Sequence, residues 1–362
     1  MPLNTEHSFQ PDWVSPPGNT ICDILEERGI DKTSFCSSIG LGSVEFEKLL
    51  SGQAEITSTL ARRLSNSIGA SAEFWIARER QYRERVQLAT ESQIIDDTAW
   101  IREIPYQDMV KFDWIPRGAS LKEKVENCLK FFDVQSVWAW REQYKGILQT
   151  AAFRTSMTFE AMPGAVATWL RKGEIEAASI DCKAWNKESF SAAMSEIRPL
   201  TRKKNPEQFI PLLRDICKEH GVAFVVARAP MGCRASGATR FLSPSKALLL
   251  LSFRYLSDDH FWFTFFHEAG HLILHSQKAL FLEGEGMDAT HEEDEANNFS
   301  ASILIPKDME AYLAQDRLTA MEVIRIARMI GVSPGIVVGQ LQHRGALRRN
   351  QLNSLKRRFS WD

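Results

Sequence analysis

The segment DHFWFTFFHEAGHLILHS, residues 259–276, constrains the fold and chemistry of this chain more than any other. His267 and His271 lie four residues apart, so on a helix both side chains project from nearly the same side and can bind one ion. Glu268 lies about 100° round that helix from His267, where a carboxylate can reach a water on the ion without being a ligand. The surrounding apolar residues indicate a buried helix, and buried imidazoles beside a carboxylate favour a compensating divalent cation.

A second segment, HEEDEANNFSASILIP at residues 291–306, predicts another helix with an acidic start. Glu293 and Asn297 are four residues apart, so Glu293 can be the third ligand while Asn297 steadies a ligand by hydrogen bonding. Glu295 is the competing third ligand, and we favour Glu293. We expect these residues to form a metal site that hydrolyses peptide bonds. Two alternatives stay open: hydrogen-bonded core histidines beside acids that cap the second helix, or a site that binds metal and cleaves nothing.

Two further histidines flank the motif. His260 lies seven residues before His267, on the same side of the helix, which allows a substrate-polarising role, although a solvent-facing helix start is the commoner meaning. His275 lies four residues beyond His271, and we expect the end of the helix to carry it away from the ion. In the expected reaction, zinc activates a water, Glu268 takes its proton, and the peptide carbonyl is attacked.

Composition limits the class of protein. A length of 362 residues suggests two or three domains, and 44% hydrophobic residues suffice for a core in each. A formal net charge of -2 excludes a generic polyanion binder. The six cysteines lack any Cys-x-x-Cys spacing and indicate reduced thiols. Without a secretory start or an apolar run of roughly 18 residues, we expect a cytoplasmic protein with no membrane partner.

The hydrophobic pattern predicts an α+β chain that is mostly α. Short helices joined by glycine turns begin near Asn19, and an irregular helical stretch without a chemical motif runs from Trp100 to Lys203. The segments VAFVVA, RASGATRFL and ALLLLSF alternate as strands of a small sheet that leads into the motif helix. We expect a flexible arm at 1–16, a helical domain at 17–85, a helical connecting domain at 95–204, an α+β domain at 205–310 and a C-terminal helical extension at 311–362.

These motifs together carry a family resemblance. FWFTFFHEAGHLILH followed by EEDEANNFSASILIP resembles the ImmA/IrrE family of zinc metallopeptidases, and GATRFL and LSFRYLSDDHFWFT are similar to the segments that precede its motif. PPGNTICDILEERGI and GQAEITSTLARRLSNSIGASAEFWI resemble the Xre-type helix-turn-helix of HigA-like antitoxins. The tail, with IGVSPGIVVGQLQHRGAL and LNSLKRRFSW, resembles the end of the fused form, so the likeness covers nearly the whole chain.

The resemblance implies a fold and a set of roles. The domain at 17–85 would be an all-α helix-turn-helix, and that at 205–310 a zincin-like, gluzincin-type domain binding one Zn²⁺ per chain. By carry-over, His267, His271 and Glu293 would be the metal ligands, and Glu268 the catalytic acid and base. The resemblance also implies a regulator that represses an operator and is often encoded beside a toxin.

The DNA-binding part of this expectation meets a difficulty in the sequence. The second helix of such a motif reads the major groove, and LGSVEFEKLLSG supplies Ser43 and Lys48 as candidate DNA contacts but also Glu45 and Glu47. Residues 17–82 hold seven basic and nine acidic side chains. We favour operator binding over a protein-docking or dimerisation module, and a homodimer would help either role.

The basic tail from His343 to Arg358 has six Lys or Arg and no acidic residue. It could touch phosphates or an acidic partner, although a solvated amphipathic helix is the commoner meaning of such a run. Taken together, the sequence predicts an antitoxin-type transcriptional regulator that carries a zinc metalloendopeptidase domain acting on a regulatory protein or cognate toxin. The alternative is a DNA-binding or toxin-binding repressor whose metal domain is structural or sensory and not proteolytic.

Overall fold

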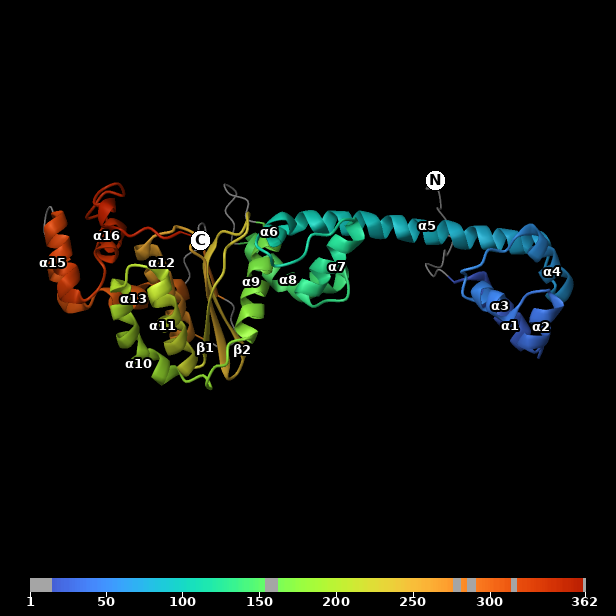
Figure 1. The fold of residues 1–362 in the computed structure, drawn as a ribbon, viewed down its shortest axis with the longest axis horizontal. Coiled ribbons are helices and arrows are strands. Elements are labelled where there is room, and N and C mark those ends of the chain that lie inside the picture. The colour runs from blue at the N-terminus through green and yellow to red at the C-terminus, as the bar shows by residue number, and fades with distance from the viewer. Residues whose placement is uncertain (1–14, 154–161, 276–280, 285–290, 314–317, 361–362) are drawn as a thin grey trace, which may run out of the picture. The chain divides into compact units, whose positions relative to one another are not determined.

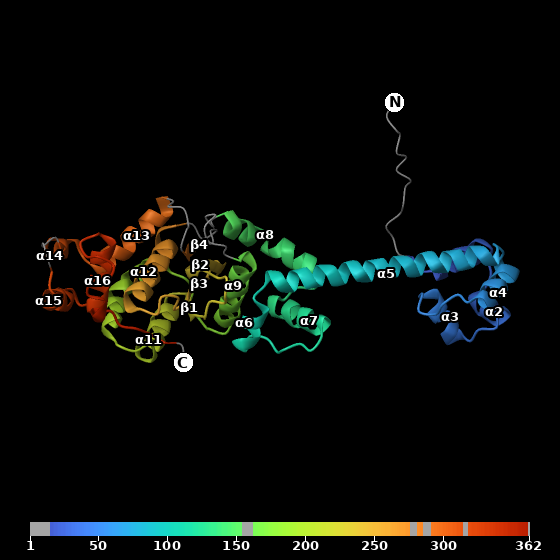
Figure 2. The same ribbon diagram turned by 90° about the horizontal axis from the view of Figure 1, so that it is seen from above.

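A computed structural model describes residues 15–153, 162–275, 281–284, 291–313 and 318–360 of the chain (Figures 1 and 2). The chain divides into two compact units, Met1–Thr98 and Ala99–Asp362. The arm expected at 1–16 lies almost entirely outside the described residues. Over the described ranges, no helix has the length and apolar character needed to cross a bilayer.

The first unit is built of short helices round one apolar core. Its elements are α1 (Pro17–Glu27), α2 (Lys32–Ser38), α3 (Ser43–Leu50), α4 (Ser58–Ile68) and the first part of α5 (Ala72–Glu103). Asp31 caps α2 by accepting the Ser34 backbone N–H at 2.8 Å, which satisfies a donor that the helix start leaves open. Phe35, Leu64 and Trp75 meet in the core.

The second unit begins with a helical cluster that has a core of its own. After the end of α5 come α6 (Tyr106–Lys111), α7 (Leu121–Phe132) and α8 (Val137–Phe153). The rings of Trp100 and Trp140 meet edge to face, with centroids 5.6 Å apart, and Phe132 contacts both. Edge contacts of this kind add to the burial of aromatic surface.

Within the described residues the strands form one four-stranded sheet. The strands are β1 (Val222–Val226), β2 (Ala235–Ser243), β3 (Lys246–Leu251) and β4 (Phe281–Gly284), in the order β1-β3-β2-β4. β1 and β3 are parallel, whereas β2 runs antiparallel to both β3 and β4. The three strands predicted from the sequence are confirmed, and the edge strand β4 was not predicted.

Both faces of the sheet are covered, as the alternation along each strand shows. Ala223, Leu248 and Leu250 share a core with α9 (Pro163–Ala178). The residues between them in sequence, such as Phe224 and Leu249, belong to the core on the other face. That second face carries α10 (Lys187–Ile197), the 3₁₀ turn η1 (Arg198–Arg202), α11 (Pro206–Glu219) and α12 (Asp258–Leu274). Figure 1 shows α9 on one side of the strands and α10 to α12 on the other.

The remaining elements complete the core on the α12 side. They are α13 (His291–Leu304), η2 (Lys307–Met309), α14 (Glu310–Leu313), α15 (Ala320–Ile330), α16 (Pro334–His343) and η3 (Asn353–Leu355). α12 packs against both α13 and α16, and α15 adds Val323 and Ile326 to the same core. The fold is therefore α+β and mostly helical, as predicted.

The basic tail does not form the amphipathic helix expected for it. α16 ends at His343, and residues 344–360 contain the 3₁₀ turn η3, an isolated β-bridge from Arg358 to Ser257 and otherwise turns and irregular backbone. Gly345 has a positive φ of 76°, a conformation that ends a helix and that glycine adopts without steric cost. The expectation was wrong because long-range contacts, and not local charge repetition, set the path of the tail.

Those contacts fix the tail at the start of α12. Lys356 Nζ lies 2.6 Å from Asp259 Oδ2, and both side chains are almost buried. The Arg357 guanidinium donates to the backbone oxygens of Thr201 and Lys203 at 3.1 and 2.9 Å. Phe359 is buried among aromatic rings. Contacts with the tail thus hold the first turn of the motif helix in place.

Candidate metal centre

The motif helix α12 is buried along most of its length. Its first turn follows Ser257, and apolar residues occupy several of its faces, among them Phe265 and Phe266, which are fully buried. A helix apolar on all sides belongs in a core, and its few polar side chains are therefore conspicuous. His267, Glu268 and His271 are each at most 2% exposed.

Glycine in the motif lets the second helix approach. A Cβ at Gly270 would lie 3.1 Å from Phe299 Cδ1 and 3.3 Å from Ala296 Cα, so α13 packs directly on this position. Ser300 Oγ also donates to the backbone oxygen of Phe263 at 2.9 Å, which ties α13 to α12. This close crossing brings the acidic start of α13 to the histidines.

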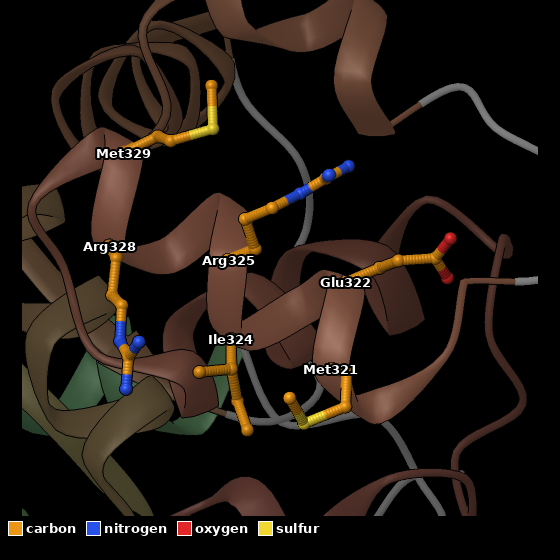
Figure 3. A pocket seen from close by; sticks show the side chains of 6 residues that line it. All are labelled: Met321, Glu322, Ile324, Arg325, Arg328 and Met329. Atoms are coloured by element: carbon orange, nitrogen blue, oxygen red, sulfur yellow. The ribbon is translucent and has the colours of Figure 1, made fainter.

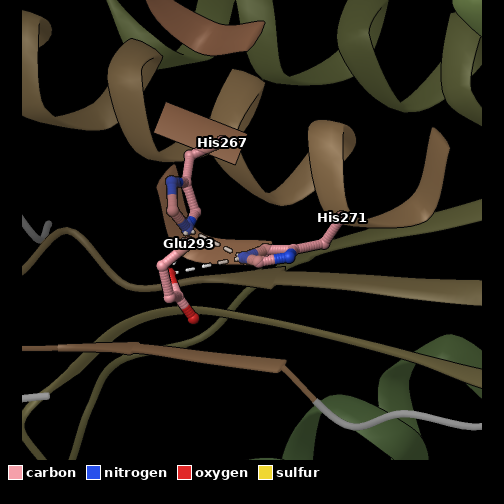
Figure 4. A group of neighbouring side chains, drawn as sticks. All are labelled: His267, His271 and Glu293. Atoms are coloured by element: carbon pink, nitrogen blue, oxygen red, sulfur yellow. Dashed lines mark hydrogen bonds and ion pairs between the residues drawn. The ribbon is translucent and has the colours of Figure 1, made fainter. Parts of the chain in front are cut away.

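Three side-chain atoms converge at the crossing (Figure 4). The Nε2 atoms of His267 and His271 are 3.0 Å apart, and Glu293 Oε2 lies 3.1 and 3.5 Å from them. Ligands of a tetrahedral zinc at about 2.0–2.1 Å are separated from one another by roughly 3.3 Å. The donor set and its spacing therefore fit a zinc ion.

The charge states at this crossing also suit a cation. Burial alone would raise the pKa of Glu293, but its close contacts with the imidazoles of His267 and His271, when no ion lies between them, outweigh burial and lower that pKa to about 2. Burial lowers the pKa of His271, although the neighbouring Glu293 carboxylate acts to raise it. An ionised carboxylate beside a neutral imidazole is the state in which ligands accept a divalent metal.

Asn297 orients the first histidine. Its Oδ1 lies 3.0 Å from His267 Nδ1, and an amide oxygen only accepts hydrogen bonds. His267 Nδ1 therefore carries the proton and donates it, while the Nε2 lone pair points to the converging atoms. Asn297 thus lies beside His267, and its role in supporting a metal ligand stays a prediction.

Glu268 lies on the sheet side of α12 and is not one of the three converging donors. It is fully buried, and a Cβ at Gly237 of β2 would overlap its Oε1 and lie 2.7 Å from its Cγ. Thr264, one turn earlier, would contact the same Cβ at 2.7 Å. A glycine in the strand thus leaves the space in which this carboxylate rests.

His260 is not brought to the three donors. It is exposed, and its ring stacks on Tyr255 with centroids 4.3 Å apart. Seven residues of helix place it about 10 Å along the axis from His267. It lines a small hollow with Ser236 and Thr264, and a role toward substrate stays a prediction.

Glu295 and His275 take up positions that the sequence analysis did not assign. Glu295 Oε2 lies 3.0 Å from His275 Nε2, and His275 Nδ1 lies 3.0 Å from His271 Nδ1. α12 ends at Leu274, so His275 is no ligand, but its ring turns back behind His271. The repeated four-residue spacing of the histidines was the sequence signal that could have found this contact.

Two other surface features contain none of the three converging donors. Ser43 begins α3 and Lys48 lies in its last turn, both exposed, while Glu45 accepts the Gly42 backbone N–H at 3.0 Å and so caps the helix. Figure 3 shows a hollow on α15 that shares no residue with the metal centre. It is lined by Met321, Glu322, Ile324, Arg325, Arg328 and Met329.

Comparison with known families assigns part of the chain. Residues 217–342 match the family model Peptidase_M78, described as the IrrE N-terminal-like domain. No curated protein matches the chain. The matched segment runs from the end of α11 to α16 and includes the three converging donors and Glu268. Over residues 217–342, about a third of the chain, the sequence is therefore similar to the IrrE N-terminal-like domain that defines this peptidase family.

Proposed function

We propose that the second unit is a zinc-dependent endopeptidase. The observation that carries this proposal is the convergence of His267, His271 and Glu293 at the crossing of α12 and α13, inside a segment that matches a peptidase family. Zinc bound there would lower the pKa of a coordinated water to about 7 and polarise a peptide carbonyl. The ligand residues hold the ion, and the chemistry of proton transfer belongs to Glu268.

Glu268 accepts a proton from the attacking water at its carboxylate. The water oxygen bonds to the carbonyl carbon, the C–N bond breaks, and the proton passes from Glu268 to the leaving amine. Its full burial suits this task, because proton transfer needs a carboxylate held in one position. Gly237 supplies the space for that position.

The test combines metal content with cleavage. The purified protein is expected to hold about one zinc per chain, and Glu268→Gln should keep that zinc while losing peptidase activity. Since the substrate is unidentified, new N-termini are labelled in a bacterial proteome incubated with the wild-type protein or with Glu268→Gln. Identical sets of N-termini from the two would rule out a peptidase and leave a structural or sensory metal domain.

The first unit supports a second proposal, that the chain is a transcriptional regulator. Helices α2 and α3 are joined by a four-residue connection, Ile39 to Gly42, a geometry that fits a helix-turn-helix. Ser43 and Lys48 are exposed on α3, where base or phosphate contacts would form. We propose operator DNA as its ligand, a homodimer as the binding form, and a regulatory protein or cognate toxin as the partner of the peptidase domain.

A further inference from the structure

The second metal ligand is backed by a chain of hydrogen bonds that leads out of the site. His271 Nδ1 lies 3.0 Å from His275 Nδ1, and His275 Nε2 lies 3.0 Å from Glu295 Oε2. The side chains of His271 and His275 are 1% and 7% exposed, whereas that of Glu295 is 46% exposed. The chain therefore joins a buried imidazole to a carboxylate at the surface.

Metal binding would fix the direction of every bond in this chain. If the His271 Nε2 lone pair binds the cation, the ring proton is on Nδ1 and is donated to His275 Nδ1. His275 then carries its own proton on Nε2 and donates it to the Glu295 carboxylate. In this arrangement each nitrogen of His271 and His275 has a partner, and both imidazole rings are neutral.

Phe281 of β4 shields this chain. Its ring stacks on His271 with centroids 4.1 Å apart and an interplanar angle of 14°, and it also contacts the His275 ring at 5.3 Å. An apolar cover of this kind excludes competing water, and hydrogen bonds are electrostatically stronger where water is excluded. Behind His267, by comparison, the Asn297 amide oxygen lies 3.0 Å from Nδ1.

We propose that His275 and Glu295 are positioning residues, which hold the tautomer and ring orientation of His271 for the metal. This inference rests on the proposed zinc site. Loss of a hydrogen-bond partner behind a metal-binding histidine typically weakens metal affinity by about 10- to 100-fold, and we expect an effect of that size here.

The experiment measures metal affinity, by chelator competition with Zn²⁺, and the visible absorption spectrum of the Co²⁺-loaded full chain. His275→Phe keeps a ring but has no acceptor, so affinity should fall by about 10- to 100-fold and the Co²⁺ spectrum should change. His275→Asn offers an amide oxygen where Nδ1 stood and should rescue most of the affinity. Glu292→Gln, on an exposed residue of the same helix, is the matched control and should leave both readouts unchanged.

Glu295→Ala provides an independent variant, because a 46% exposed side chain can be removed without disturbing the core. This variant should bind Zn²⁺ more weakly than the wild type, as His275→Phe should. A wild-type chain that takes up no metal would refute the proposed function itself. If the wild type binds Zn²⁺ and the variants His275→Phe and Glu295→Ala bind it with the same affinity and give the same Co²⁺ spectrum, the positioning role is overturned and the proposed zinc site is not. Equal losses in His275→Phe and His275→Asn would also overturn it, since packing would then explain the effect.

Discussion

Gly237 lies directly against Glu268, and a side chain as small as methyl at this strand position would overlap the carboxylate. Gly237→Ala should therefore displace Glu268 while leaving the three metal donors in place. A displacement of about 1 Å at a catalytic group can cost on the order of 10²-fold in rate. We expect a loss of that order in peptidase activity with zinc content unchanged, measured by cleavage assay and metal analysis.

Gly146→Ala, in the middle of α8 with no atom near the added methyl group, is the matched control. It should stabilise the helix by about 0.5–1 kcal/mol and leave cleavage unchanged. If Gly237→Ala cleaves at the wild-type rate, the placement of Glu268 against β2 has no part in catalysis.

Replacing the carboxylate ligand should weaken metal binding. Glu293→Gln keeps the shape of the side chain but removes the charge that faces two imidazole nitrogens at 3.1 and 3.5 Å. We expect at least about a 10-fold loss of Zn²⁺ affinity by chelator competition, comparable with loss of a supporting contact. Glu292→Gln, on the exposed neighbouring residue, should bind as tightly as the wild type, and equal affinities for the two variants would remove Glu293 from the ligand set.

Asp258 should make stability depend on pH. Burial raises the pKa of its carboxyl group above the ordinary 3.8, although hydrogen bonds from Ser333 and the Arg357 backbone oppose the shift. A carboxyl group with a raised folded-state pKa stabilises the fold fully below its unfolded pKa, and this contribution is lost as pH rises through the folded pKa.

Chemical denaturation of the wild type and of Asp258→Asn from pH 3.5 upward provides the test. Relative to Asp258→Asn, the free energy of unfolding of the wild type should fall as pH increases above about 3.8. Parallel curves for the two proteins would contradict the prediction.

The ion pair of Lys356 and Asp259 should raise the free energy of unfolding, whereas exposed basic residues of the tail should not. Lys356→Ala would leave the 7% exposed Asp259 carboxylate without its ammonium partner, and removing one member of a buried pair costs about 3–5 kcal/mol. Arg349→Ala, on an exposed residue of the same basic run, should change the free energy of unfolding by less than about 0.5 kcal/mol. Urea unfolding distinguishes the two outcomes, and similar values would mean that the pair contributes nothing.

Operator binding can be tested at Lys48. If its ammonium contacts a phosphate, Lys48→Ala should weaken binding uniformly across sequences and reduce the slope of log affinity against log salt by about 1. Electrophoretic mobility shifts at two salt concentrations, with a DNA fragment that carries the promoter of the gene encoding this protein, measure the affinity and its salt dependence. Lys122→Ala, on an exposed lysine of α7, should behave as wild type, and no shift of the wild type even at low salt would exclude the repressor role.

The sequence predicted those features that local spacing determines. Short strand-type segments rich in apolar residues placed β1, β2 and β3, and the four-residue spacing of His267 and His271 placed two nitrogens on one helix face. β4 was missed because a four-residue strand is too short to show a period. The contact of His275 with His271 was missed because it depends on where α12 ends.

The tail illustrates a second limit. Its run of basic residues suggested a solvated helix, but the partners of Lys356 and Arg357 are Asp259, Thr201 and Lys203, far away in the sequence. Nothing in the local pattern identifies such partners. The preference for Glu293 over Glu295 used the four-residue spacing of Glu293 and Asn297, whereas the contact of Glu295 with His275 depends on the crossing over Gly270 and could not be predicted from spacing.

That crossing has a mechanical consequence. Two of the donors belong to α12 and the third to α13, so an ion held between them fastens one helix to the other. Without an ion, the two helices would still be joined by the packing at Gly270 and by side-chain hydrogen bonds, among them Ser300 to Phe263 and His267 to Asn297. An ion bound at this crossing would therefore add a link between α12 and α13, and metal removal is expected to weaken the packing of the two helices.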